Sequence, residues 1–294
     1  MKQVAKLILL SSATAAVLGQ APELIEEGVQ DMQEDSGIVG DWNPNWNYDQ
    51  NGADWAFMNC NNTKQQQSPV DLLKQGMDWY HPEKGLQLSF LPAYKAAVPT
   101  RQDSATNFTY TVWGDFGQTF ATEPSDYPVT QVIKWDAKYI KFHYPSEHTL
   151  NGTQFALEMQ IYHQEEFWTH AICVSGIGII SMFFNVSTEQ PQVDNPFFAF
   201  LDGKSPLDLK TLIPMDFSMR NYLMGYVGTN TVPNCERGVC WYFVRDVQYL
   251  SQAQFDKLKV DGVQSNNRKV NPQMKAYKQY DAQGLLYTPP PSEQ

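Results

Sequence analysis

Two segments of alternating polar and apolar residues carry the side chains most able to do chemistry. Residues 138–144 and 154–163 each place apolar side chains on one face and polar side chains on the other, which predicts two strands. Each strand directs its polar groups to what is expected to be one shared surface. The groups so placed are Lys141, His143, Glu158 and Gln160. Such a cluster is either a functional site or a solvated face, and the residue types alone leave both interpretations open.

Other patterns that could carry chemistry are missing from the sequence. Among the 5 histidines no His-x-His or His-x-x-x-His spacing occurs, so a separate metal site is not indicated. No Gly-x-Ser-x-Gly turn, phosphate-binding glycine loop or cysteine–histidine pair is present either.

The elements that must position the polar cluster are strands. Residues 177–184 form a continuous apolar run, which predicts a strand covered on both faces. Pro145 and Asn151-Gly152 supply turn chemistry between the two alternating segments. An aromatic content of 13%, mostly Tyr and Phe, also favours a β-rich interior.

Composition limits the class of protein. The 294 residues, 42% of them hydrophobic, are enough to bury a large core. The formal net charge is −11 and no cluster of Lys and Arg occurs, so nucleic acid is not expected as a partner.

The ends of the chain predict a secretory route. Residues 1–19 are typical of a signal peptide, and residues 20–41 of an acidic flexible leader. The domain is expected to span residues 42–280, and residues 281–294 to form a flexible proline-rich tail. No transmembrane segment is expected, because no apolar run reaches the required length.

Sequons and cysteines agree with secretion or residence in the lumen of the secretory pathway. Glycosylation is expected at the sequons that begin at Asn61, Asn107, Asn151 and Asn185. The cysteines are Cys60, Cys173, Cys235 and Cys240. Their even number is compatible with two disulfides, but their spacing does not select among the possible pairings.

Several motifs in the right order resemble the α-class carbonic anhydrases. The stretch from Lys141 to Gly152, followed by residues 157–163, is similar to the metal-binding core of that family. Further matches lie at Trp46-Asn47-Tyr48, at residues 67–72, at residues 226–235 and at Asn266-Asn267-Arg268. The resemblance implies a mainly β (α+β) single domain around a large twisted, mostly antiparallel sheet of about ten strands, with short surface helices.

In the resembling family, three histidines hold a zinc ion whose bound water becomes hydroxide at neutral pH and hydrates carbon dioxide. The corresponding positions here are Lys141, His143 and Gln160. A lysine ammonium has no lone pair, and an amide oxygen is a poor zinc ligand. We therefore expect no bound zinc and no other cofactor.

Other family positions are partly retained. The resemblance implies that Glu158 orients a ligand from behind, and that Thr231 with its partner Glu147 orients the zinc-bound hydroxide. Tyr110 is placed at the proton-shuttle position. The family's disulfide between the N-terminal segment and the active-site loop corresponds to Cys60 and Cys235. Cys173 and Cys240 have no family counterpart, so a second bridge and two buried thiols both stay open.

The sequence is compatible with three functions. The chain is expected to be a catalytically inactive binding or structural module with an unidentified protein partner. One alternative is a divergent zinc-dependent carbonate dehydratase. The other is a silent subunit of a larger assembly, docked through its leader and tail.

If Lys141 enters the former metal cavity, its ammonium is expected to neutralise Glu158.

Overall fold

The computed structural model describes residues 46–56, 59–61, 67–72, 91–101, 108–123, 131–165, 175–213, 223–244, 246–271 and 279–280. The predicted signal peptide, leader and tail lie outside these residues. Within them strands dominate, and helix is limited to the 3-10 helices η3 (Pro196–Asp202) and η4 (Leu209–Thr211) and to α1 (Gln252–Leu258). No helix among the described residues is long and apolar enough to cross a membrane.

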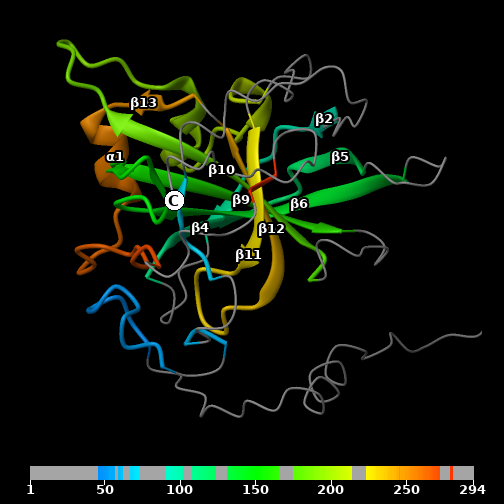
Figure 1. Ribbon diagram of the computed structural model, residues 1–294. Coiled ribbons are helices and arrows are strands. Elements are labelled where there is room, and N and C mark those ends of the chain that lie inside the picture. Colours follow the sequence, from blue (N-terminus) through cyan, green and yellow to red (C-terminus); the bar gives the residue numbers. More distant parts are fainter. Residues whose placement is uncertain are drawn as a thin grey trace, which may run out of the picture. The chain divides into compact units, whose positions relative to one another are not determined.

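A large sheet of 11 strands forms the framework (Figure 1). Its strands are β2 (Leu91–Tyr94), β3 (Thr100–Arg101), β4 (Tyr110–Trp113), β5 (Gly117–Glu123), β6 (Gln131–His143), β9 (Leu157–Glu165), β10 (Ile177–Val186), β11 (Leu223–Thr229), β12 (Arg237–Val244), β13 (Gln248–Leu250) and β14 (Gln279–Tyr280). A small second sheet joins β1 (Asp71–Leu72), β7 (Thr149–Leu150) and β8 (Thr153–Gln154).

The order of the large sheet is β14-β11-β12-β10-β9-β6-β4-β3, with β13 beside β10 and the β2–β5 pair on β6. The long strand β6 pairs with β5 through its first half and with β4 through its second half. All neighbours are antiparallel except that β10 runs parallel to β12 and β13. The large, mostly antiparallel sheet expected from the resemblance is confirmed.

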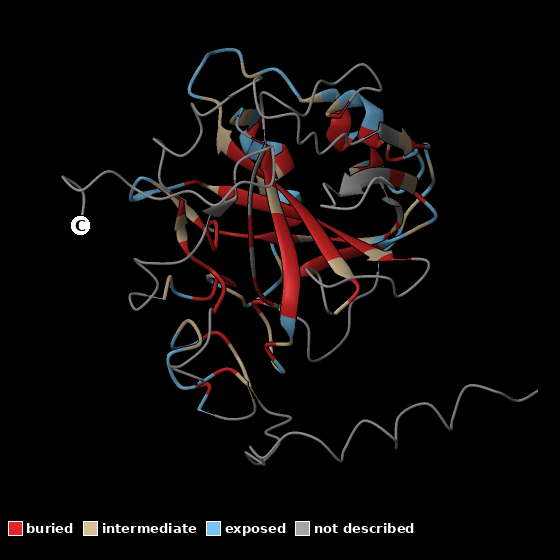
Figure 2. Cartoon of the chain, turned by 45° about the vertical axis from the view of Figure 1, so that its right-hand side comes forward, coloured by how far each residue is buried: buried red, intermediate tan, exposed pale blue. Residues whose placement is uncertain are grey.

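Hydrophobic side chains cover both faces of the sheet. The central strands are buried almost throughout (Figure 2). Strand β10 shows the alternation. Ile180, Met182 and Phe184 belong to one apolar cluster, which the aromatic side chains of η3 complete, and Ile179 and Phe183 belong to the other. The prediction that this apolar run is a strand covered on both faces is therefore confirmed.

The helix α1 follows from local sequence. The side chain of Ser251 accepts a hydrogen bond from the backbone nitrogen of Gln254. The side-chain oxygen of Gln254 in turn accepts a hydrogen bond from the backbone nitrogen of Ser251. This capping box satisfies two backbone donors that a helix start would otherwise leave unpaired.

Candidate functional site

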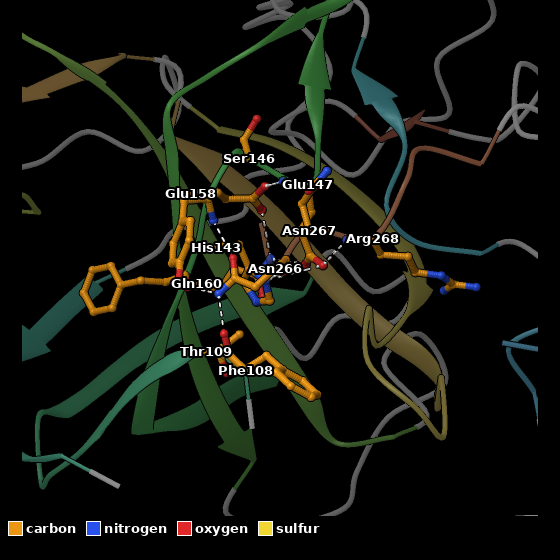
Figure 3. Close-up of polar contacts among 12 residues, drawn as sticks. Phe108, Thr109, His143, Ser146, Glu147, Glu158, Gln160, Asn266, Asn267 and Arg268 are labelled. Carbon is orange, nitrogen blue, oxygen red and sulfur yellow. Dashed lines mark hydrogen bonds and ion pairs between the residues drawn. The ribbon is translucent and has the colours of Figure 1, made fainter. Parts of the chain in front are cut away.

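The polar side chains predicted to share a surface do meet, because β6 and β9 are antiparallel neighbours in the required register. Lys141 lies opposite Gln160, and His143 lies opposite Glu158. Glu147, in the turn after β6, reaches the same place (Figure 3). The side chains of His143, Glu147, Glu158 and Gln160 are completely buried. The interpretation as a solvated face, which the sequence left open, is thereby excluded.

His143 is held by one of its two ring nitrogens. Its Nδ1 lies 2.7 Å from the backbone oxygen of Asn266. A carbonyl oxygen only accepts, so Nδ1 is the donor, and in the neutral form of the ring the lone pair lies on Nε2. That Nε2 atom is buried, and no described residue gives it a hydrogen-bond partner.

Gln160 is fully engaged by its neighbours. Its Nε2 donates to Glu147 Oε2 at 2.8 Å and to Glu158 Oε1 at 3.0 Å. Its Oε1 accepts from the hydroxyl of Tyr162 at 3.2 Å, and the same hydroxyl lies 3.1 Å from Asn230 Oδ1. The amide therefore links two buried carboxylates to the loop that carries Asn230.

Glu158 is anchored by His148 rather than by Lys141. It accepts hydrogen bonds from His148 Nδ1 at 2.9 Å and from Ser181 Oγ at 2.8 Å, and two from the backbone nitrogens of Glu147 and His148. Burial alone would raise the pKa of Glu158, but the attraction and hydrogen bonds of His148 lower it to about 2. His148 thus braces Glu158 through both its ring and its backbone nitrogen.

Lys141 lies over aromatic rings instead of forming the expected ion pair with Glu158. Its Nζ is 4.9 Å from the ring centre of Tyr162 and 5.5 Å from that of Tyr139, and these two rings stack at 4.5 Å. Burial lowers the pKa of Lys141 to about 8, although the charge of Glu147 opposes the shift. The ion-pair prediction was wrong because Glu158 already has closer partners.

Replacing Lys141 by Met is therefore expected to stabilise the fold at pH 7. A pKa lowered on folding means that the unfolded chain binds the proton more readily, so the charge on Lys141 opposes folding below about pH 8. The gain should be about 1–3 kcal/mol, after allowance for the lost contact with the rings. It should shrink as the pH rises from about 8 towards 10.5, the ordinary pKa of lysine.

Urea denaturation of Lys141→Met at pH 7 and at pH 10 measures this difference. Lys138→Met is the matched control, because Lys138 lies on the same strand with its side chain 49% exposed. A Lys141→Met variant that is less stable than the natural protein at pH 7 would contradict the prediction. It would support an ion pair between Lys141 and Glu158 instead.

Thr231 and Glu147 are not paired in the way the resemblance implied. Glu147 Oε1 accepts from the backbone nitrogen of Arg268 at 2.9 Å, and its Oε2 accepts from Gln160. The hydroxyl of Thr231 is buried, and no described residue bonds to it. The amide of Gln160 has therefore taken the place at Glu147 that the hydroxyl was expected to hold.

Tyr110 does not face the site. It pairs with Phe142 across β4 and β6, its ring contacts Phe142 edge-on, and both belong to the apolar cluster on the opposite face. Thr111, opposite Lys141, occupies the site face instead. The proton-shuttle position assigned to Tyr110 thus holds a core residue, because side chains alternate faces along a strand.

Two residues of the closing segment hold the site together, although the sequence predicted no role for them beyond a motif match. Asn266 anchors His143 through its backbone oxygen, and its side chain accepts from the backbone nitrogen of Tyr144 at 2.6 Å. The guanidinium of Arg268 donates to the backbone oxygens of Ser68 and Cys60 at 2.6 and 2.8 Å. The Asn-Asn-Arg motif was the signal that could have identified them.

The expected disulfide between Cys60 and Cys235 is present, with Cα atoms 5.0 Å apart. Cys240 is disulfide-bonded as well, and Cys173 lies outside the described residues.

Among the sequon asparagines, Asn61 and Asn151 are exposed. Asn185 is partly buried, and its Oδ1 accepts from the backbone nitrogen of Ala156. Asn107 lies outside the described residues.

Fold and site together define a mainly β protein whose large sheet carries a buried cluster of one histidine, two carboxylates and one amide on one face. The profile of the eukaryotic-type carbonic anhydrases matches residues 50–281, and the chain belongs to that family.

Individual relatives agree with this assignment. The chain is 26% identical over 266 residues to alpha carbonic anhydrase 4 of Arabidopsis thaliana, which covers 89% of this chain and 86% of the relative. It is 25% identical over 227 residues to dioscorin DB3L of Dioscorea polystachya, covering 75% and 71% of the two chains.

Solved structures share the fold. The alpha-carbonic anhydrase of Photobacterium profundum aligns with a TM-score of 0.57 at 21% identity, over 78% of this chain and 97% of the other. A dioscorin complexed with ascorbate aligns with a TM-score of 0.53 at 21% identity, over 81% and 95%.

Proposed function

We propose that this chain is a carbonic anhydrase-like protein without a zinc site, which acts as a non-catalytic binding or structural module in the secretory pathway. The engagement of Gln160 carries the proposal. Its amide nitrogen donates to both buried carboxylates and its oxygen accepts from Tyr162, so this side chain is committed to protein contacts.

The residues present do not fit a zinc ion. A catalytic zinc of this kind needs three neutral imidazoles. Of the three ligand positions, only His143 offers a ring nitrogen, which is buried and has no partner among the described residues, while Lys141 offers an ammonium that repels a cation. One imidazole cannot replace a three-histidine cage, so a reaction step at zinc does not fit this site.

The space beside these positions also argues for a binding or structural role. Tyr162 is 2% exposed and stacks on Tyr139, and its hydroxyl ties Gln160 to Asn230. A bulky phenol at this place leaves little room for a small gaseous substrate. Tyr110, at the proton-shuttle position, belongs to the core on the other face and is not placed to carry protons out of the site.

The cysteines and sequons support the secretory route. The bond between Cys60 and Cys235 is of the kind that persists in oxidising compartments. Exposed Asn61 and Asn151 are accessible for glycosylation. The partner of the module is expected to be a protein.

Zinc content and hydration rate test the proposal together. Protein purified without chelators and then incubated with zinc should contain far less than one zinc per chain by elemental analysis. Stopped-flow assays should give carbon dioxide hydration at the rate of the buffer alone. Stoichiometric zinc, or hydration well above that background, would refute the proposal.

A further inference from the structure

A second candidate site lies away from the buried polar cluster, where β2, β4, β5 and β6 come together. A pocket of about 670 Å³ opens there, and its lining includes Lys95, Trp113, Asp115, Gln118, Asp136 and Lys138. This volume is in the range of pockets that bind small molecules. None of the residues at the former ligand positions lines it.

Trp113 gives this pocket an apolar platform. The residue is 42% exposed, which is unusual for so large an apolar side chain, and its ring packs on Tyr139 with centroids 4.5 Å apart. Tyr139 in turn stacks on the buried ring of Tyr162. The indole is thus supported from the protein side while it remains accessible at the pocket. Such a rigid ring loses little entropy when a ligand stacks on it.

The charges around Trp113 compensate one another. Lys95 lies 2.5 Å from Asp115, and Lys138 lies 3.4 Å from Asp136. Two ammonium and two carboxylate groups leave the lining without a net charge, so it favours neither an anion nor a cation. The same groups, with the amide of Gln118, offer donors and acceptors around the indole.

The turn between β4 and β5 fixes the shape of the pocket. Gly117 has φ of +84°, and a Cβ there would lie 2.7 Å from the backbone oxygen of Ala93. Only glycine fits this conformation and this close approach, so the shape of the turn depends on Gly117.

We propose that this pocket binds a neutral oligosaccharide, with the C–H face of one pyranose ring stacked on Trp113 and its hydroxyls bonded to the surrounding Asp, Lys and Gln side chains. A sugar ring presents an apolar face and a rim of hydroxyls that both donate and accept hydrogen bonds. The apolar face matches the indole of Trp113, and the hydroxyls match the lysine and aspartate pairs around it. β-Linked glucose fits best, since its hydroxyls are equatorial and both ring faces are apolar. The inference does not depend on whether the buried cluster binds zinc.

Isothermal titration with cellohexaose and laminarihexaose tests this proposal. We expect saturable binding of at least one of them to the natural protein, with a Kd of about 0.1–1 mM. Trp113→Ala should weaken that binding about tenfold or more, and Trp113→Phe should weaken it less. Tyr249→Ala is the matched control, because Tyr249 is 57% exposed and does not line the pocket, and its binding should be unchanged.

Three results would overturn the proposal. The first is the absence of saturable binding of both hexasaccharides to the natural protein. The second is binding that Trp113→Ala leaves unchanged while circular dichroism shows the variant folded. The third is tighter binding of a charged galacturonate hexamer than of either neutral sugar, since a charge-balanced lining should not prefer an anion.

Discussion

Replacing Lys141 and Gln160 by histidine is expected to convert the natural chain, which we expect to be free of zinc, into one that binds about one zinc per chain. The two imidazoles would stand on adjacent strands beside His143, whose Nε2 is buried and has no hydrogen-bond partner in the described part of the chain. Three imidazoles supply the ligand set that a catalytic zinc site uses. Zinc affinity should rise by several orders of magnitude, to a Kd of about 1 μM or tighter.

The neighbours of Gln160 also favour this outcome. Glu158 Oε1 now accepts from the Gln160 amide at 3.0 Å, so the carboxylate is in reach of an imidazole at the same position. An acceptor behind a ligand histidine fixes its tautomer and orientation. Removal of the amide also frees Glu147 Oε2 from its hydrogen bond with Gln160.

Hydration of carbon dioxide by the double variant should nevertheless be slow. Tyr162 and Asn230 still occupy the space beside the site. Tyr110 belongs to the apolar cluster on the opposite face, so it is not placed to transfer protons from the site to solvent. A positioned proton-transfer group is worth about 10²–10⁴-fold in rate, and added imidazole buffer should restore part of that loss.

Elemental analysis and stopped-flow hydration, with and without imidazole, measure both halves of this prediction. The two single variants should bind zinc weakly, and addition of His143→Asn to the double variant should abolish binding. A folded double variant without zinc would mean that the two strands no longer present their side chains at ligand spacing.

Alternation along the strands was enough to predict the central part of the fold and the site. Residues 138–143 of the first segment fall inside β6 and residues 177–184 inside β10, and residues 154–163 largely overlap β9. The strict two-residue period of a strand places Lys141 and His143 on one face whatever the rest of the chain does. The same period shows why the assignment of Tyr110 failed: an error of one residue moves a side chain to the other face.

Contacts made by loops could not be predicted in this way. His148 reaches Glu158 from the turn after β6, and Asn266 reaches His143 through a backbone oxygen that leaves no side-chain signature in the sequence. Because the ring of His148 and the two backbone donors to Glu158 come from such a segment, the alternation pattern suggested Lys141 instead. Only the folded chain shows that Lys141 lies over the rings of Tyr162 and Tyr139.

Loss of the disulfide between Cys60 and Cys235 is expected to produce the largest fall in stability of any change considered. The two residues are separated by 175 positions in the sequence. Closing so long a loop restricts the unfolded chain, and the chain-entropy account assigns it about 5 kcal/mol. The bond also lies in a small cluster with Tyr48 and Trp55, so Cys60→Ala with Cys235→Ala removes packing as well.

The effect should extend to the site. Cys235 closes the segment that carries Asn230 and Thr231, and the backbone oxygen of Cys60 accepts from Arg268 at 2.8 Å. Arg268 in turn donates its backbone nitrogen to Glu147. Without the covalent bond, the N-terminal segment and this loop are joined only by contacts of the kind that thermal motion opens first.

Urea denaturation of the Cys60→Ala, Cys235→Ala double variant should show unfolding free energy lowered by about 4–5 kcal/mol and a melting temperature lowered by about 10 °C or more. Trp55→Phe is the packing control, because it perturbs the same cluster while the covalent bond stays in place, and it should cost about 1–2 kcal/mol. Peptide mapping of the natural protein without reduction should recover the peptides that contain Cys60 and Cys235 as one disulfide-linked pair. Two free thiols there, or a double variant as stable as the natural chain, would show that the bond does not hold the segment to the loop.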